Sequence, residues 1–68
     1  MTWERIIIEE DPEWQEYHLT LPVGVVKIWE REPNLWGVSY TVNGMRHMKM
    51  FEAVTSDLAK VKALKYVS

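Results

Sequence analysis

The residues best suited to metal chemistry in this 68-residue sequence lie in the run MRHMKM, at positions 45–50. Methionine thioethers are soft ligands that select Cu(I), and imidazole suits copper as well. An Asn-Gly pair directly before the run predicts a tight hairpin turn, so the run should form a strand whose side chains alternate between two faces. Met45 and His47 then share one face, and Met48 and Met50 share the other. Because these ligands do not converge, we expect no metal site.

The rest of the sequence contains no recognisable catalytic motif. There is no cysteine, no Ser-His-Asp arrangement suggests itself, and the three glycines lack the spacing of a phosphate-binding loop. Glu9 and Glu10 are adjacent carboxylates, but they precede Asp11-Pro12, where a loop is expected and both are solvated. His18 stands beside acidic residues and is interpreted as a surface residue or as one whose hydrogen bonds are satisfied within the protein. We therefore expect a protein that is not an enzyme, with neither catalytic residues nor a cofactor.

Length and composition indicate one small globular domain over residues 1–68. Apolar residues make up 47% of the chain and charged residues 26%, which is ordinary for a folded protein. Without cysteine, neither a disulfide nor a thiolate metal site can support so small a fold, so core packing or self-association must stabilise it. No apolar run approaches the ~18 residues of a membrane span, and no signal-peptide pattern opens the chain. We expect a soluble, cytoplasmic protein with no membrane partner.

The formal net charge of -2 conceals an asymmetry between the two halves of the chain. Residues 1–34 carry eight acidic and three basic residues, a net charge of -5, whereas residues 35–68 carry two acidic and five basic residues, a net charge of +3. Such a split indicates either a solvated surface whose halves attract each other or two functional surfaces of opposite sign. We favour the first interpretation.

The elements that must position these side chains are short strands followed by a helix. Period-two alternation between Pro, Gly and Asn turn signals predicts strands at 2–10, 14–21, 25–31, 35–42 and 45–51. The last segment changes period, with Leu58, Val61 and Leu64 at helical spacing, and predicts a helix at about 56–66. Thr55 or Ser56 can cap its start. The expected fold is α+β, an antiparallel β-meander of four to five strands with one C-terminal amphipathic helix packed on one sheet face.

The turn at Asn43-Gly44 determines which residues face each other across the last hairpin, because a two-residue loop fixes the register. The expected pairs are Val42 with Met45, Tyr40 with His47, Val38 with Lys49, and Trp36 with Phe51. The side chains of these pairs all lie on one face of the hairpin. This face is mostly apolar and aromatic, and we interpret it as the core face.

The third strand has two possible registers against the fourth. A three-residue loop of Pro33, Asn34 and Leu35 would place Val26 and Ile28 on the core face. A loop one residue shorter would swap the two sets of side chains, because side chains alternate between faces with period two. We prefer the register that buries Val26 and Ile28.

The opposite face of the sheet is the candidate binding surface. On the preferred register it gathers bases, one large aromatic, small polar residues and methionines. Its members are Lys27, Trp29, Arg31, Ser39, Thr41, Arg46, Met48 and Met50. Arg and Trp are the residue types that most often carry interface energy, and methionine makes pliable contacts. The structural alternative is a partly covered face on which Trp29 packs against the first two strands.

A pattern runs from residue 35 to residue 66. Its features are Trp36 and Tyr40 on a strand, the Asn43-Gly44 turn, basic Arg46 and Lys49, Phe51, and then a capped helix. The pattern resembles the three-stranded-sheet-plus-helix N-terminal (arm-binding) domain of phage and transposon tyrosine integrases, and the related plant ethylene-response DNA-binding domain. The resemblance implies that the sheet face opposite the helix lies in the DNA major groove, with Arg46, Ser39 and Thr41 as reading positions. It also implies a phage or mobile-element accessory protein.

Two functions remain as hypotheses for the candidate surface. The first is a small non-enzymatic regulator or inhibitor that docks on a protein partner through this sheet face or through the acidic N-terminal strands. The alternative is a DNA-binding domain that reads the duplex with the same face. Duplex binding depends on phosphate neutralisation, and the chain is acidic overall, so the protein partner is our leading hypothesis. A homodimer is a further hypothesis, because the first or fifth strand can present an unprotected edge.

Overall fold

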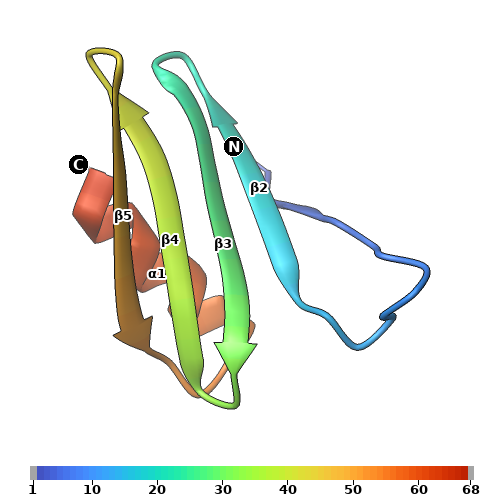
Figure 1. Cartoon of the computed structure of the whole chain (residues 1–68). Coiled ribbons are helices and arrows are strands. Elements are labelled where there is room, and N and C mark those ends of the chain that lie inside the picture. The colour runs from blue at the N-terminus through green and yellow to red at the C-terminus, as the bar shows by residue number, and fades with distance from the viewer. Residues whose placement is uncertain (1, 68) are drawn as a thin grey trace.

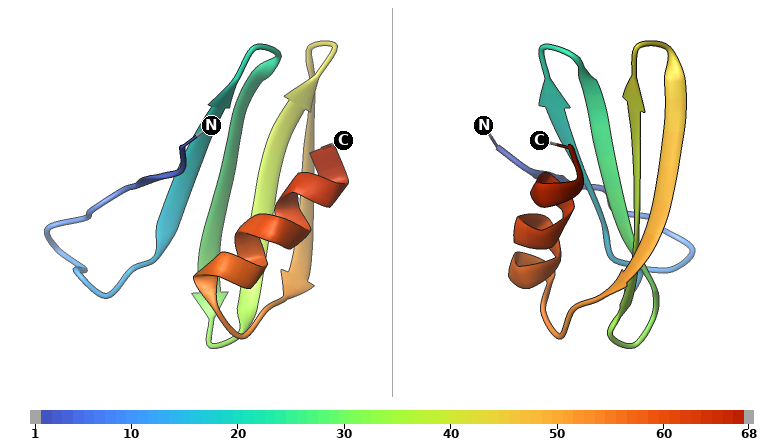
Figure 2. Two further views of the ribbon diagram at one scale, coloured as in Figure 1. Left: turned by 180° about the vertical axis from the view of Figure 1, so that it is seen from behind. Right: turned by 90° about the vertical axis from the view of Figure 1, so that its left-hand side faces the viewer.

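The computed structural model describes residues 2–67, which form a five-stranded antiparallel sheet with one helix on one of its faces (Figure 1). The elements are β1 (Glu4–Arg5), β2 (Glu16–Leu21), β3 (Gly24–Glu32), β4 (Leu35–Val42), β5 (Met45–Glu52) and α1 (Ser56–Val67). The strands are adjacent in chain order, so the predicted α+β meander is confirmed. Only one face of the sheet is covered by the helix (Figure 2). No helix within residues 2–67 has the length and apolar character needed to span a membrane.

The β4–β5 hairpin has the predicted register. Asn43 and Gly44 both adopt positive φ, at 51° and 78°, as the two central residues of a type I′ turn require. Pairing runs without interruption from Val42 opposite Met45 to Leu35 opposite Glu52. This hairpin therefore fixes which side chains of β4 and β5 share a face.

The β3–β4 connection differs from the prediction in its loop and agrees with it in its faces. The loop has two residues, Pro33 and Asn34, and not three, because Asn34 adopts a positive φ of 66° and closes a tighter turn. The register then shifts between Glu30 and Glu32, so one extra residue lies in β3. The shorter loop alone would have exchanged the two faces of β3. The extra residue shifts the register by one and returns its side chains to the predicted faces. Val26 and Ile28 are consequently buried, as predicted.

The first predicted strand, at residues 2–10, is largely wrong. Only Glu4 and Arg5 form β1, which pairs with β2. The Ile6 N–H still donates to the Glu16 carbonyl of β2 at 2.9 Å, and the chain then leaves the sheet. It makes two successive turns, in which Asp11 N–H donates to the Ile8 carbonyl and Trp14 N–H to the Asp11 carbonyl, both at 3.1 Å. These turns, and not pairing with β2, satisfy the N–H groups of Asp11 and Trp14.

Helix α1 packs on the sheet through its alanines. Ala59 and Ala63 are fully buried, whereas Leu58 and Val61 are exposed. The packing face is therefore centred on small residues, with Leu64 partly buried beside them, whereas the other two residues whose spacing indicated the helix point away from the core. Alanine lets the helix backbone approach the bulky side chains that already fill this face of the sheet. The first turn is capped by Thr55, whose Oγ1 accepts the Leu58 N–H at 3.1 Å.

The hydrophobic core lies between the sheet and α1. Its large members are Tyr17, Leu19, Val26, Ile28, Trp36, Val38, Tyr40 and Phe51. The buried indole N–H of Trp36 donates to the Ala53 carbonyl at 3.1 Å, which ties the strand–helix junction to the core.

One part of the predicted core face lies outside this core. Val42, Met45, His47 and Lys49 are exposed. The tip of the β4–β5 hairpin extends past the end of α1, so the helix does not cover it (Figure 2). His47 instead stacks on the Tyr40 ring, with centroids 5.3 Å apart.

Candidate functional site

The candidate site is the open face, which is the side of the sheet turned away from α1 (Figure 2). Strand register arranges its side chains in rows that cross β2 to β5. The first row is Glu16, Trp29, Gly37 and Met50, the second is His18, Lys27, Ser39 and Met48, and the third contains Thr20, Val25, Thr41 and Arg46. These rows contain every residue of the predicted binding surface except Arg31.

Trp29 lies across β4, over the backbone of Gly37. A Cβ placed on Gly37 would come within 2.5 Å of Trp29 Cζ2 and 2.6 Å of Cε2, so the indole occupies the space that a side chain would need. Gly37 is buried beneath the ring, and Trp29 itself is half-buried. The ring therefore packs toward β4, and not on the first two strands alone as the structural alternative supposed. It supplies a large aromatic surface at the centre of the open face.

Arg46 and Ser39 are joined by a hydrogen bond across β4 and β5. The Arg46 Nε–H donates to Ser39 Oγ at 3.1 Å, and Ser39 is buried beneath it at 5% exposure. Arg46 itself is exposed. A guanidinium has five N–H donors, so anchoring through Nε leaves the others for a ligand. The bond orders the longest side chain of the open face.

Two exposed methionines of the open face lie on β5, on the side of Gly37 away from Trp29. Met50, in the same row, is 40% exposed, and Met48, in the next row, is 57% exposed. Met45 and His47 belong to the other face, so the alternation expected of the Met-rich run is confirmed. Within residues 2–67 no three or more His, Asp or Glu side chains are grouped so that they could hold a metal ion.

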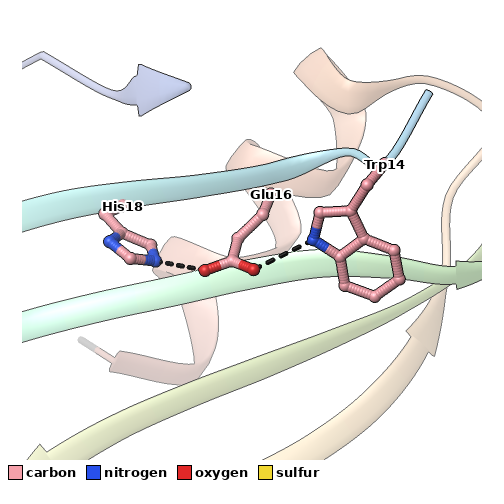
Figure 3. Close-up of polar contacts among 3 residues, drawn as sticks. All are labelled: Trp14, Glu16 and His18. Carbon is pink, nitrogen blue, oxygen red and sulfur yellow. Dashed lines mark hydrogen bonds and ion pairs between the residues drawn. The ribbon is translucent and has the colours of Figure 1, made fainter. Parts of the chain in front are cut away.

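Glu16, the first residue of β2, links Trp14, which precedes the strand, with His18 on the strand, at the border of the open face (Figure 3). The Trp14 Nε1–H donates to Glu16 Oε1 at 3.0 Å, and His18 Nε2 lies 2.6 Å from Glu16 Oε2. Partial burial acts to raise the pKa of the Glu16 carboxyl. The hydrogen bonds from Trp14 and His18, together with the electrostatic attraction of His18 and Lys27, outweigh burial, and the pKa lies below its ordinary value of 4.5. The carboxylate is therefore held ionised beside Trp29, its partner in the strand register.

Two shallow hollows divide the charges around the sheet. One is basic and lies on the open face, where Lys27 and Arg46 line it together with Ser39 and Thr41. The other is mainly acidic and lies at the far end of β3. Its polar lining consists of Asp11, Glu13, Gln15, Glu30, Arg31 and Glu32. Arg31 falls at the register shift of β3 and belongs to this second hollow, apart from the other predicted binding residues.

Several residues of the open face were missing from the sequence-based set. Glu16 and His18 on β2, together with Trp14 just before it, form a hydrogen-bonded border, and Val25 is an exposed apolar residue on β3. The alternation within residues 16–21 already separated Glu16 and His18 from the buried residues. Extending the pairing of β3 by one strand would therefore have placed them on the open face.

No protein-family model matches the chain, and neither a curated protein nor a solved structure shows a significant match to it. The function is therefore inferred from the surface of the molecule.

Proposed function

We propose that this chain is a non-enzymatic binding module, a small regulator or inhibitor, that docks on a protein partner through the open face. The observation that carries the proposal is the apolar surface at its centre, where Trp29 covers Gly37 and both Met48 and Met50 are exposed. Soluble monomers rarely leave contiguous apolar surface uncovered unless it serves an interaction. Full burial of one such side chain contributes about 1.5–3 kcal/mol.

The polar groups around this centre suit the rim of a protein interface. Arg46 is ordered by Ser39, and Glu16 is ordered by Trp14 and His18. Preordered charged groups lose less side-chain entropy when they meet a partner, and they add specificity at the border of an apolar contact. A partner on the open face would therefore present apolar side chains at its centre and polar groups of both signs around them.

The acidic N-terminal region was the other docking surface considered from the sequence. Its carboxylates Asp11 and Glu13 gather with Glu30 and Glu32 around the hollow at the end of β3. This end lies outside the rows that contain Trp29 and the methionines. A partner on the open face would accordingly contact the apolar and basic groups first, and the acidic end would serve only a partner that extends beyond β3.

Site-specific photo-crosslinking tests the proposal. A benzophenone amino acid replaces Met48 on the open face in one variant and Val61 on the outer surface of α1 in a matched control. Both native side chains are exposed apolar residues, at 57% and 54%, so the probes are equally accessible. In a lysate of the source cells we expect a discrete adduct at position 48 that contains a protein other than a second copy of this chain, and excess wild-type protein should compete it away. Equal yields from both positions, or an adduct that wild-type protein does not compete, would contradict the proposal.

DNA binding is the second candidate function, and one observation favours it. Lys27, Ser39, Thr41 and Arg46 line one shallow hollow on the face opposite α1, which is where a duplex would lie. A titration of 5-fluorotryptophan-labelled protein with duplex DNA, followed by ¹⁹F NMR, separates the two functions. DNA binding predicts a shift of the Trp29 resonance that weakens steeply with salt and is lost in Arg46→Ala. Protein docking predicts no shift with DNA even at low salt.

A further inference from the structure

The two edges of the sheet are protected very differently. At one edge β1 has only two residues, and the chain then turns away, so little of the edge is available for pairing. At the other edge β5 has eight residues, contains neither proline nor an irregularity in its pairing, and is exposed at every position except Phe51. No other described strand pairs with its outer side, and the C-terminal turn of α1 projects past this edge on the covered face (Figure 2). A long, regular and exposed edge strand is a template for another strand.

The backbone groups at this edge can be assigned from the hairpin. In a two-residue hairpin the pair next to the turn is hydrogen-bonded, and bonded and non-bonded pairs alternate beyond it. Met45 is the residue next to the turn, so it points its backbone N–H and C=O toward β4. Arg46, Met48, Met50 and Glu52 then direct theirs outward. An incoming antiparallel strand must bond to these four residues.

A second copy of β5 fits this requirement in an antiparallel register centred on Lys49. In this register Met48 lies opposite Met50 of the second copy, and Arg46 lies opposite Glu52 of the second copy. Both pairs occur twice because the arrangement has two-fold symmetry. All of these residues direct their backbone groups outward. The Glu52 carbonyl already accepts a hydrogen bond from Lys62 Nζ at 2.6 Å and keeps a second lone pair for the new ladder. The opposite charges at the two ends select this register over its neighbours.

The one unfavourable pair in this register is Lys49 with its own copy. In the structure the Lys49 ammonium lies 5.4 Å from the centre of the Tyr66 ring of its own chain, over α1. This contact gives the ammonium a partner other than water. The register also contains two pairs of opposite charge, Arg46 with Glu52, against one pair of like charge. Tyr66 is itself partly exposed beside Phe51 at this edge, with ring centroids 5.8 Å apart, so pairing also covers aromatic surface.

We propose that two copies of the chain pair through β5 in this register and form one continuous ten-stranded sheet, with both helices on the same side. The proposal does not depend on the docking of a partner on the open face. It unites the two open faces into one surface, with Met48 and Met50 at the junction.

Charge reversal tests the register directly. We expect wild-type protein to sediment at twice its chain mass in analytical ultracentrifugation as its concentration is raised. Arg46→Glu and Glu52→Arg should each weaken association by at least ~10-fold, because each variant places like charges at both ends of the ladder. An equimolar mixture of the two variants should associate again, since each then meets opposite charges on the other. Recovery in the mixture cannot arise if either variant is unfolded.

Proline substitutions in β5 test the same pairing independently, because they remove single backbone N–H groups. Met48→Pro removes one outward N–H, and we expect a folded monomer, because proline is tolerated in edge strands where the N–H faces solvent. Lys49→Pro is the matched control, since it removes an N–H that bonds to β4 and should unfold the hairpin. Wild-type protein that stays monomeric at all concentrations would overturn the proposal. So would single charge variants that associate as tightly as wild type, or a mixture of them that stays monomeric.

Discussion

The indole of Trp29 lies on the backbone of Gly37, at a distance that leaves no room for a Cβ, since one placed there would come within 2.5 Å of Trp29 Cζ2. Glycine at this position has a packing role, because it provides the flat seat on which the ring is held. The seat also determines what the open face presents, namely an aromatic plane flanked by exposed methionines. Any side chain at position 37 should displace that plane.

Gly37→Ala should move the Trp29 ring off the sheet. We expect a red shift of the Trp29 emission and a loss of about 1–3 kcal/mol in the free energy of unfolding, as in overpacked sites. Fluorescence of the variant and its denaturant midpoint are the measurements. Gly44→Ala is the control, because it strains the positive φ of the turn but has no heavy atom within 4 Å of an added Cβ. The emission spectrum of Gly44→Ala should match that of the wild type. An unchanged spectrum in Gly37→Ala would contradict the packing of Trp29 on Gly37.

Helix α1 should tolerate changes on its outer surface and resist them on its alanine face. Ala63→Leu introduces volume where Ala63 is fully buried, and we expect a loss of about 1–3 kcal/mol in the free energy of unfolding. Leu58→Ala, on the exposed side, should change it by less than ~0.5 kcal/mol apart from helix propensity. Urea denaturation followed by circular dichroism compares the two. A larger effect at Leu58 than at Ala63 would mean that the helix packs through the other face.

The cap of α1 can be assigned to one of two hydroxyls. Thr55 Oγ1 accepts the Leu58 N–H, so Thr55→Ala should lower the free energy of unfolding by about 1 kcal/mol. Ser56 lies one residue later, inside the helix. Ser56→Ala should therefore be neutral or slightly stabilising in the same thermal or chemical denaturation experiment. The reverse order of effects would assign the cap to Ser56.

Glu16 should make stability depend on pH in the acidic range. Its pKa is lowered in the folded state, so its stabilising contribution is present above the unfolded value of 4.5 and is lost as the pH falls through the lower folded value. We expect Glu16→Gln to lower the free energy of unfolding by roughly 0.5–1 kcal/mol at neutral pH. The difference from wild type should shrink below pH 4.5. Glu9→Gln, at an exposed position, is the matched control for the loss of one carboxylate from the chain. An equal pH dependence in the two variants would contradict the role of Glu16.

The parts of the fold that sequence predicted well are those fixed by local chemistry. Asn43-Gly44 specifies a turn type, and the turn type specifies the register of β4 and β5. The β3–β4 loop shows a limit of this logic. Its length was predicted wrongly, yet Val26 and Ile28 were placed correctly, because the irregularity near Glu30 compensates the shorter turn. Burial constrains the face of a strand more strongly than the count of loop residues does.

The parts that sequence missed depend on distant partners. Residues 6–10 have strand propensity, but only the Ile6 N–H bonds to β2, and the chain then turns through Ile8, Asp11 and Trp14. The helix shows the same effect, since the space left above the sheet decides that Ala59 and Ala63 face inward. On the open face, alternation identified the members, but the seat of Trp29 on Gly37 depends on the register of two strands and has no local signal.

The most direct test of the proposed function is competition for the crosslink formed at position 48. Unlabelled wild-type protein and Val61→Ala should suppress the adduct equally, because Val61 lies on the outer surface of α1. Trp29→Ala, confirmed as folded by circular dichroism, should compete at least ~10-fold less well, since it removes the central aromatic group. If Trp29→Ala competes as well as wild type, the open face is not the docking surface.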